Sequence, residues 1–174
     1  MKKRGFSLLE TMLAVTVLGF VLAGSAGLIV NVIRSFNWTT SAIDADQSAS
    51  MAMQKITRDL QPAKQVVVQS PTSLLIYYPF KNADGTYTKT ILDTTNTVQY
   101  YRGNANGVAN PTGAYILRKP ALSAYSEVTS GVTNLQFTSP NPANVTITLG
   151  TNRKGGTSNV TCDLVQRAVF LRNY

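Results

Sequence analysis

The 174-residue sequence predicts an α+β fold, with one very long N-terminal helix whose C-terminal half packs on an antiparallel β-sheet. Two observations carry this prediction. No proline occurs from Phe6 to Gln61, and apolar or small residues dominate that stretch, which places the helix at about residues 6–61. From residue 65 onward, short runs of β-branched, apolar and aromatic residues alternate with turn residues, a pattern typical of strands.

The first half of the predicted helix is hydrophobic on all sides. Thr11 to Ile33 form a run of 23 residues without a charge. At 1.5 Å per residue such a run spans ~35 Å, enough to cross a hydrocarbon core of about 30 Å. Glu10 lies at the edge of this run, and a carboxylate deep in lipid costs roughly 2–4 kcal/mol. We therefore expect Glu10 to have a partner.

The second half of the predicted helix is amphipathic. Its small and apolar residues recur at steps of three or four, which places them on one stripe. The members of this stripe are Trp38, Ala42, Ala45, Ala49, Ala52, Ile56 and Leu60, and the polar face carries Asp46, Ser50, Gln54 and Arg58. Because most of the stripe is alanine, it permits close approach of the predicted sheet. Pro62 ends the helix.

Eight strands are predicted after the helix. Asp84-Gly85 is a turn signal, so Thr86–Leu92 is expected to pair back on Leu74–Phe80 as a hairpin. The polar and glycine-containing stretch Thr151–Asn159 is interpreted as a loop. The predicted strands are Gln65–Gln69, Ser73–Tyr78, Thr86–Leu92, Thr97–Arg102, Ala114–Lys119, Val132–Thr138, Asn144–Leu149 and a last one near Leu164–Arg172.

The first ten residues contain the most specific motif of the sequence. A basic cluster is followed by a glycine, an aromatic residue and, four positions later, a single glutamate: Lys2, Lys3, Arg4, Gly5, Phe6 and Glu10. This arrangement resembles the signal of the type IV pilin and pseudopilin superfamily. Two looser matches, Met53–Ala63 and Gly131–Phe137, are similar to the larger minor pilins and J-type pseudopilins.

The resemblance implies how the N-terminus is processed and used. A prepilin peptidase cuts between Gly5 and Phe6 and methylates the Phe6 amine. Glu10 then pairs with the N-terminal amine of a neighbouring subunit in a filament. The resemblance further implies a leader at residues 1–5, a transmembrane and filament-core helix at 6–34, and a soluble pilin-like domain at 35–174.

The same resemblance implies the location and the partners of the chain. It starts as a single-pass protein of the bacterial inner membrane, where the basic leader holds the N-terminus in the cytoplasm, and ends in an extracytoplasmic filament. Its partners are other pilin subunits, the prepilin peptidase and the inner-membrane assembly machinery. Many major pilins carry a proline midway down the helix and a C-terminal disulfide, both missing from this sequence, which favours a minor pilin or pseudopilin.

Two other interpretations of the N-terminus compete with this one. A secretory signal peptide has a basic start and an apolar core, with a small-residue cut here near Ala23–Ala26. Against it, Glu10 interrupts the start of the apolar core, which also continues past that cut. A plain membrane anchor explains the length of the run, but neither Gly5-Phe6 nor Glu10. A secreted or anchored β-rich protein outside any filament thus stays an alternative.

Composition gives no support to catalysis. The sequence has no histidine, and its only cysteine, Cys162, excludes an intrachain disulfide and is expected to be a buried small apolar residue. Its carboxylates are scattered, and no phosphate-binding, hydrolase or metal-ligand motif occurs. We therefore predict a non-enzymatic protein without a catalytic site, a cofactor or a metal. The formal charge of +8 lies partly in the basic leader.

DNA binding is the alternative function. Five aromatic and basic residues, Tyr100, Tyr101, Arg102, Arg118 and Lys119, fall on two strands predicted to pair. Basic residues beside exposed aromatic rings suit base stacking and phosphate contact, and some minor pilins of competence systems bind DNA. The competing interpretation is that these are ordinary sheet residues, because tyrosine is favoured on half-buried strands.

Overall fold

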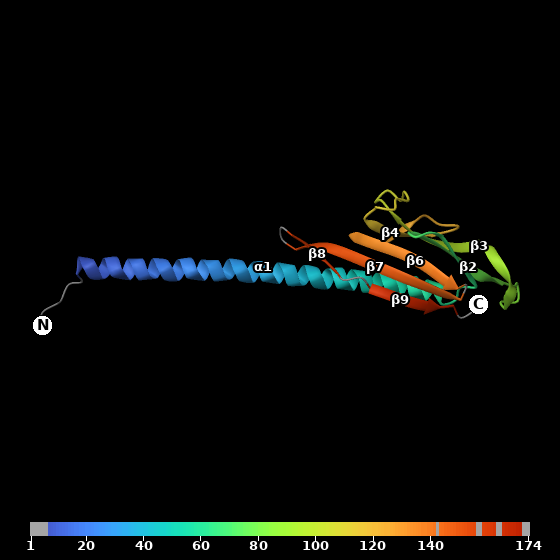
Figure 1. Cartoon of the computed structure of the whole chain (residues 1–174), viewed down its shortest axis with the longest axis horizontal. Helices are drawn as coiled ribbons and strands as arrows, with labels where there is room; N and C mark the ends of the chain where they lie inside the picture. The colour runs from blue at the N-terminus through green and yellow to red at the C-terminus, as the bar shows by residue number, and fades with distance from the viewer. Residues whose placement is uncertain (1–6, 142, 156–157, 163–164, 172–174) are drawn as a thin grey trace.

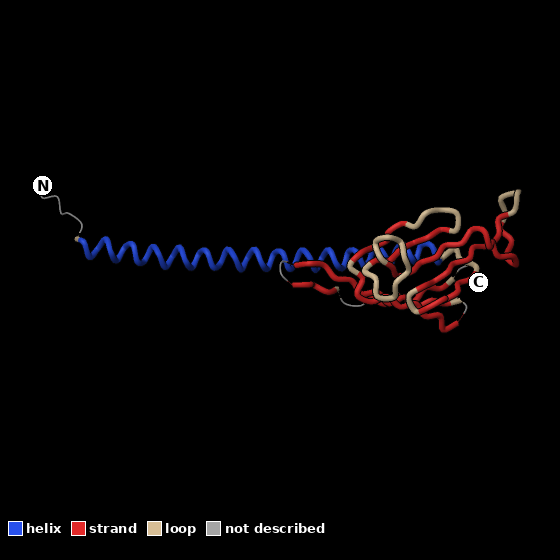
Figure 2. The backbone as a smooth tube through the Cα atoms, turned by 90° about the horizontal axis from the view of Figure 1, so that it is seen from above, coloured by secondary structure: helices blue, strands red, loops and turns tan. Residues whose placement is uncertain are grey.

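One unbroken helix dominates the protein. The computed structural model describes residues 7–141, 143–155, 158–162 and 165–171. Helix α1 (Leu8–Leu60) has 53 residues, which corresponds to a length of ~80 Å. Its first half projects alone, and its second half lies against the β-strands (Figure 1). The tube view from above shows the same two parts (Figure 2). The predicted α+β layout is confirmed, although Phe6 lies outside the described residues.

The strands of the described residues form two antiparallel sheets. One sheet has five strands in the order β1-β2-β3-β4-β5, and the other has the order β6-β7-β8, with β9 also pairing β7. The strands are β1 (Gln65–Ser70), β2 (Ser73–Lys81), β3 (Tyr87–Gly103), β4 (Tyr115–Pro120), β5 (Ser126–Ser130), β6 (Val132–Asn141), β7 (Asn144–Gly155), β8 (Ser158–Thr161) and β9 (Val165–Phe170).

The predicted stripe of α1 is the face that meets the sheets. Five of its members are completely buried: Ala45, Ala49, Ala52, Ile56 and Leu60. The prediction is wrong at the N-terminal end of the stripe, because Trp38 is 56% exposed and Ala42 is only half-buried. Strand β7 is the main partner of the helix. Its alternating residues Val145, Ile147 and Leu149 are buried, as the sequence pattern predicted.

Strand β7 is longer than predicted and forms hydrogen bonds with the helix. The expected loop Thr151–Asn159 is wrong, because β7 continues to Gly155 and β8 pairs back on it. The buried Thr151 hydroxyl donates to the Ala45 carbonyl oxygen at 2.8 Å, and the Ser41 hydroxyl donates to the Lys154 carbonyl oxygen at 2.8 Å. These side-chain bonds fasten a polar segment that has little strand propensity of its own.

The predicted β2–β3 hairpin forms, but only the distal part of β2 pairs with the predicted segment. Strand β3 joins two predicted strands into one of 17 residues. Leu74 pairs with Tyr100, whereas Phe80 pairs with Thr88, so Thr86–Leu92 contributes only the distal end of the ladder. Irregularities in the pairing between Tyr77 and Phe80 absorb the extra residues of β3. Strand β5, which was not predicted, pairs with β4.

Alanine at the helix–sheet contact is testable by overpacking. We expect Ala49→Leu to lower the free energy of unfolding by about 1–3 kcal/mol, because the completely buried Ala49 leaves no room for a larger side chain. The measurement is urea unfolding of the full chain in detergent, monitored by near-UV circular dichroism. Gln47→Leu, on the exposed side of the same helix, is the matched control. Equal effects of the two substitutions would contradict the close helix–sheet packing.

Candidate functional site

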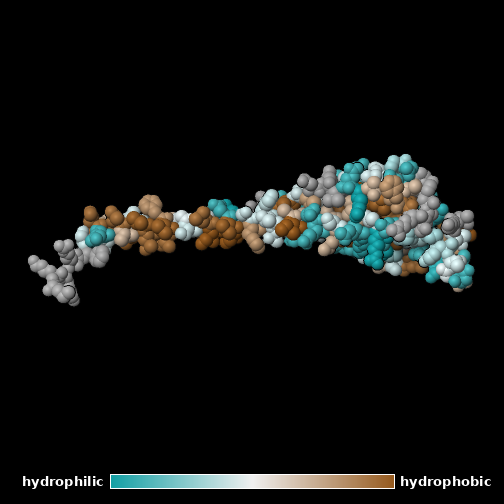
Figure 3. All heavy atoms as spheres, turned by 90° about the horizontal axis from the view of Figure 1, so that it is seen from below, coloured by the Kyte–Doolittle hydropathy of each residue, from teal (hydrophilic) through white to brown (hydrophobic). Residues whose placement is uncertain are grey.

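The N-terminal half of α1 has no covering from the rest of the described chain. Every residue of this stem (residues 7–40) is exposed. Apolar side chains stand out along the stem in the space-filling view (Figure 3). By length and composition α1 is able to cross a membrane, and none of its most apolar 18-residue window is buried. So large an apolar surface indicates contact with lipid or with other protein chains.

Several hydroxyl groups of the stem donate hydrogen bonds to its own backbone. Thr16 donates to the Met12 carbonyl oxygen at 2.8 Å, and Ser25 donates to that of Val21 at 2.8 Å. Thr11 donates to the Leu8 carbonyl oxygen at 2.9 Å. Groups paired in this way are compatible with an apolar environment, in which every unsatisfied polar group is costly.

Glu10 differs from these hydroxyl-bearing residues. It lies in the first turn of α1, where its backbone N–H donates to the Ser7 carbonyl oxygen at 3.0 Å. Within the described ranges, no hydrogen bond or ion pair to its carboxylate is present, and the residue is exposed. The positive end of the helix dipole favours a negative charge at this position. The predicted processing residues Lys2, Lys3, Arg4, Gly5 and Phe6 lie outside the described residues.

Comparison with protein families decides what this N-terminus is. Residues 1–26 match the model of the prokaryotic N-terminal methylation motif. The chain carries a prepilin-type signal of the type IV pilin and pseudopilin kind. The signal indicates a pilin-like or pseudopilin structural subunit and suggests association with other such subunits. Together with the apolar helix, it fits anchoring in a membrane followed by an extracellular filament. No curated protein and no solved structure matches the chain.

The second set of predicted site residues occupies paired strands, as expected. In the β3–β4 ladder, Tyr100 lies opposite Arg118 and Gln99 lies opposite Lys119. The expectation of exposed aromatic rings is nevertheless wrong. Tyr100 is completely buried, and Tyr101 is 5% exposed. Neither ring is available for base stacking in this conformation.

Tyr101 is covered by the loop that follows β3. The Tyr101 hydroxyl donates to the Gly107 carbonyl oxygen at 2.8 Å. Gly107 has φ of +79°, a conformation that favours glycine. A Cβ atom at this position would overlap the ring of Tyr125, so glycine also permits the close contact between the loop and that ring.

The two arginines of the predicted set form internal contacts. Arg118 Nε lies 2.7 Å from Asp59 Oδ2 in an ion pair. Arg102 donates to the carbonyl oxygens of Gly113 and Val132 and thereby connects β3 to the loop before β4 and to the start of β6. Lys119 is exposed. DNA binding at this place stays a hypothesis, without the stacking surface that motivated it.

Asp59 connects the end of α1 to the middle of the five-stranded sheet. Its Oδ2 atom accepts hydrogen bonds from Arg118 Nε at 2.7 Å and from the Tyr100 hydroxyl at 2.9 Å. Burial, reinforced by the negative charge of Asp59, raises the pKa of the Tyr100 hydroxyl well above its usual range. The hydroxyl therefore stays protonated and remains a donor to Asp59 at any physiological pH.

Cys162 differs from the expectation of a buried apolar residue. It is half-buried, and its Sγ lies 3.6 Å from Asp46 Oδ1 on α1. The thiol thus contacts a carboxylate of the predicted polar face of the helix.

Removing the shared acceptor tests the role of Asp59. We expect Asp59→Ala to lower the free energy of unfolding by about 1–3 kcal/mol, because the buried Tyr100 hydroxyl loses its acceptor. Chemical denaturation of the full chain in detergent measures the change. The control is Asp44→Ala, an exposed carboxylate on the same helix. A loss no greater than that of the control would mean that Asp59 does not hold the helix to the sheet.

Proposed function

We propose that the chain is a structural minor pilin or pseudopilin, cut after Gly5 and assembled into a filament of the type IV pilus or type II secretion kind. The observation that carries this proposal is the methylation motif at residues 1–26, continuous with a helix whose first half is exposed along its whole length. The missing helix proline and the single cysteine support a minor subunit or pseudopilin over a major pilin.

Lipid and neighbouring subunits provide the stem with equivalent apolar surroundings. In the membrane, the run from Thr11 to Ile33 lies in the hydrocarbon core. In the filament, the stems of neighbouring subunits replace the lipid. Association in lipid depends on packing and on polar pairs rather than on removal of water. This makes the charged Glu10 the side chain with the most to gain from a partner.

The partner proposed for Glu10 is the methylated amine of Phe6 in an adjacent subunit. A charge-assisted pair of this kind is stronger than a neutral hydrogen bond, and it relieves the cost of a lone carboxylate in lipid. Because the hydroxyls of Thr11, Thr16 and Ser25 already donate within the helix, they gain nothing comparable from assembly. The pairing would favour entry into the filament over persistence in the membrane.

The ends of the apolar run fit an orientation with the N-terminus in the cytoplasm. Lys2, Lys3 and Arg4 precede the run and favour the cytoplasmic side. Arg34 follows it, and the exposed Trp38 lies one turn further along. Tryptophan is enriched where a span meets the aqueous phase. The β-sheets are then on the extracytoplasmic side.

The processing step predicts the mature N-terminus. N-terminal sequencing and mass spectrometry of the chain from its native host are expected to give N-methylated Phe6 as the first residue. Gly5→Val, which changes the residue before the cut, is expected to leave the leader attached. A mature chain that begins near Gly27 would instead establish a secretory signal peptide.

The amine pairing predicts the behaviour of a Glu10 variant. Glu10→Val is expected to leave membrane insertion intact, because it removes a cost of roughly 2–4 kcal/mol in lipid, while incorporation into filaments falls at least about tenfold. Immunoblots of membrane and sheared-filament fractions measure both quantities.

The matched control for this variant is Thr11→Val. It removes a hydroxyl from the next position, one that is satisfied within the helix. The control is expected to enter filaments normally. Normal incorporation of the Glu10 variant would show that its carboxylate has no part in assembly.

A further inference from the structure

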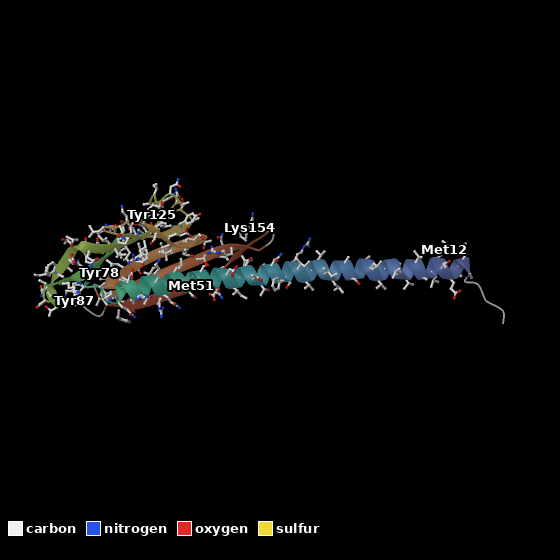
Figure 4. All side chains as sticks on the ribbon, turned by 180° about the vertical axis from the view of Figure 1, so that it is seen from behind. Met12, Met51, Tyr78, Tyr87, Tyr125 and Lys154 are labelled. Atoms are coloured by element: carbon white, nitrogen blue, oxygen red, sulfur yellow. The ribbon has the colours of Figure 1, made fainter. Side chains whose placement is uncertain are left out.

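A pocket lies at the end of the protein farthest from the stem. It has a volume of about 480 Å³ and is formed between the turn after α1 and the β2–β3 hairpin. Two of its residues, Tyr78 and Tyr87, lie at the end of the molecule opposite Met12 (Figure 4). Pockets of this size accommodate small ligands or short segments of a polymer. No residue of the stem lines this pocket, whereas one lining residue, Tyr78, also packs against the core.

Two lysines give the pocket an excess of positive charge. Lys64 and Lys81 both line it, and within the described part of the chain neither ammonium group forms a salt bridge. The backbone of Lys64 is fixed, because its N–H donates to the Tyr77 carbonyl oxygen at 2.9 Å. Two unpaired ammonium groups around one pocket favour a ligand that carries a carboxylate or another anionic group.

The pocket also holds hydrogen-bonding groups from the irregularly paired part of β3. Asp93 Oδ1 accepts from the Thr95 N–H at 3.0 Å, the Thr95 hydroxyl at 2.6 Å and the Asn96 N–H at 3.0 Å. The hydrogen bond from the Thr95 side chain is the main factor that lowers the pKa of Asp93, so this carboxylate stays ionised. The second Asp93 oxygen and the Asn96 side-chain amide are left to bind hydroxyl groups.

Aromatic side chains complete the lining. Tyr87 is 62% exposed and Tyr78 is half-buried. Burial raises the pKa of Tyr78 to about 12, which keeps its hydroxyl protonated. In the described residues this hydroxyl has no hydrogen-bond partner, so it too can bind a ligand. An exposed tyrosine ring offers a flat surface for the apolar face of a ring-shaped ligand.

We propose that this pocket binds an acidic sugar, a hexuronate unit of an anionic polysaccharide. Lys64 and Lys81 bind the sugar carboxylate, whereas Asp93 and Asn96 bind its hydroxyl groups. Tyr87 packs against the face of the sugar ring. A simple anion needs the lysines alone, and a neutral sugar needs only the other groups. An acidic sugar uses both sets at once.

This inference goes beyond the proposed function and does not depend on filament assembly. The test therefore uses the full, unassembled chain in nanodiscs of phosphatidylcholine, a lipid without net charge. Biolayer interferometry compares a trimer of α-1,4-linked galacturonate with α-1,4-galactotriose, its neutral counterpart. We expect the acidic trimer to bind about tenfold more tightly than the neutral trimer, because only the acidic trimer pairs with both lysines.

Three variants separate the parts of the pocket. The double variant Lys64→Gln/Lys81→Gln is expected to bring the affinity for the acidic trimer down to that for the neutral one. Tyr87→Ala is expected to weaken the binding of both trimers to a similar extent. Lys119→Gln changes an exposed lysine that does not line the pocket and is expected to change neither affinity. All these positions are on the surface or half-exposed, and circular dichroism verifies that each variant folds.

Four results would overturn the proposal. The first is no binding of the acidic trimer at about 10 mM, a concentration at which even weak specific sites fill. The second is equal affinity for the two trimers. The third is competition by inorganic phosphate as effective as that by galacturonate, which would leave only a general anion site. The fourth is an equal loss of affinity for the acidic trimer in Lys119→Gln and in the double lysine variant, which would mean that the trimer is attracted only by the overall charge of the protein.

Discussion

The close packing of α1 on strand β7 is the contact on which the rest of the structure depends. Alanines at positions 45, 49 and 52 are completely buried and let the strand approach the helix backbone. That approach brings the Thr151 hydroxyl within reach of the Ala45 carbonyl oxygen. With the helix in this place, both sheets share one core, and Asp59 in the last turn of α1 reaches Tyr100 and Arg118.

The helix, most strands and the signal were predictable because each rests on residues close together in the sequence. The stripe has a helical period, β7 alternates, and the motif lies within ten residues. The continuation of β7 to Gly155 was not predictable, because it depends on hydrogen bonds to Ser41 and Ala45, more than 100 positions away. The Asp59 contacts and the distal pocket likewise combine residues that only the tertiary fold brings together.

Burial also explains why the tyrosine and arginine pattern of β3 and β4 was misread. Tyrosine and arginine occur on strands both as surface residues and as members of buried polar networks. In this protein Tyr100 and Arg118 share one acceptor at the end of α1, and Arg102 is held by backbone carbonyl groups. The sequence shows that tyrosine and arginine are present on these strands. Which group each of them binds depends on how α1 packs against the sheet.

The continuity of α1 has a mechanical consequence. The helix runs unbroken from Leu8 to Leu60, and no proline kinks it. Tension applied to the stem therefore passes along one rod into the sheets. It enters first where Ser41 and Ala45 bind β7, and the Asp59 contacts lie at the far end of the same rod. The distal pocket begins with residues just after the C-terminal end of α1. Its orientation is therefore coupled to that of the stem through one continuous helix.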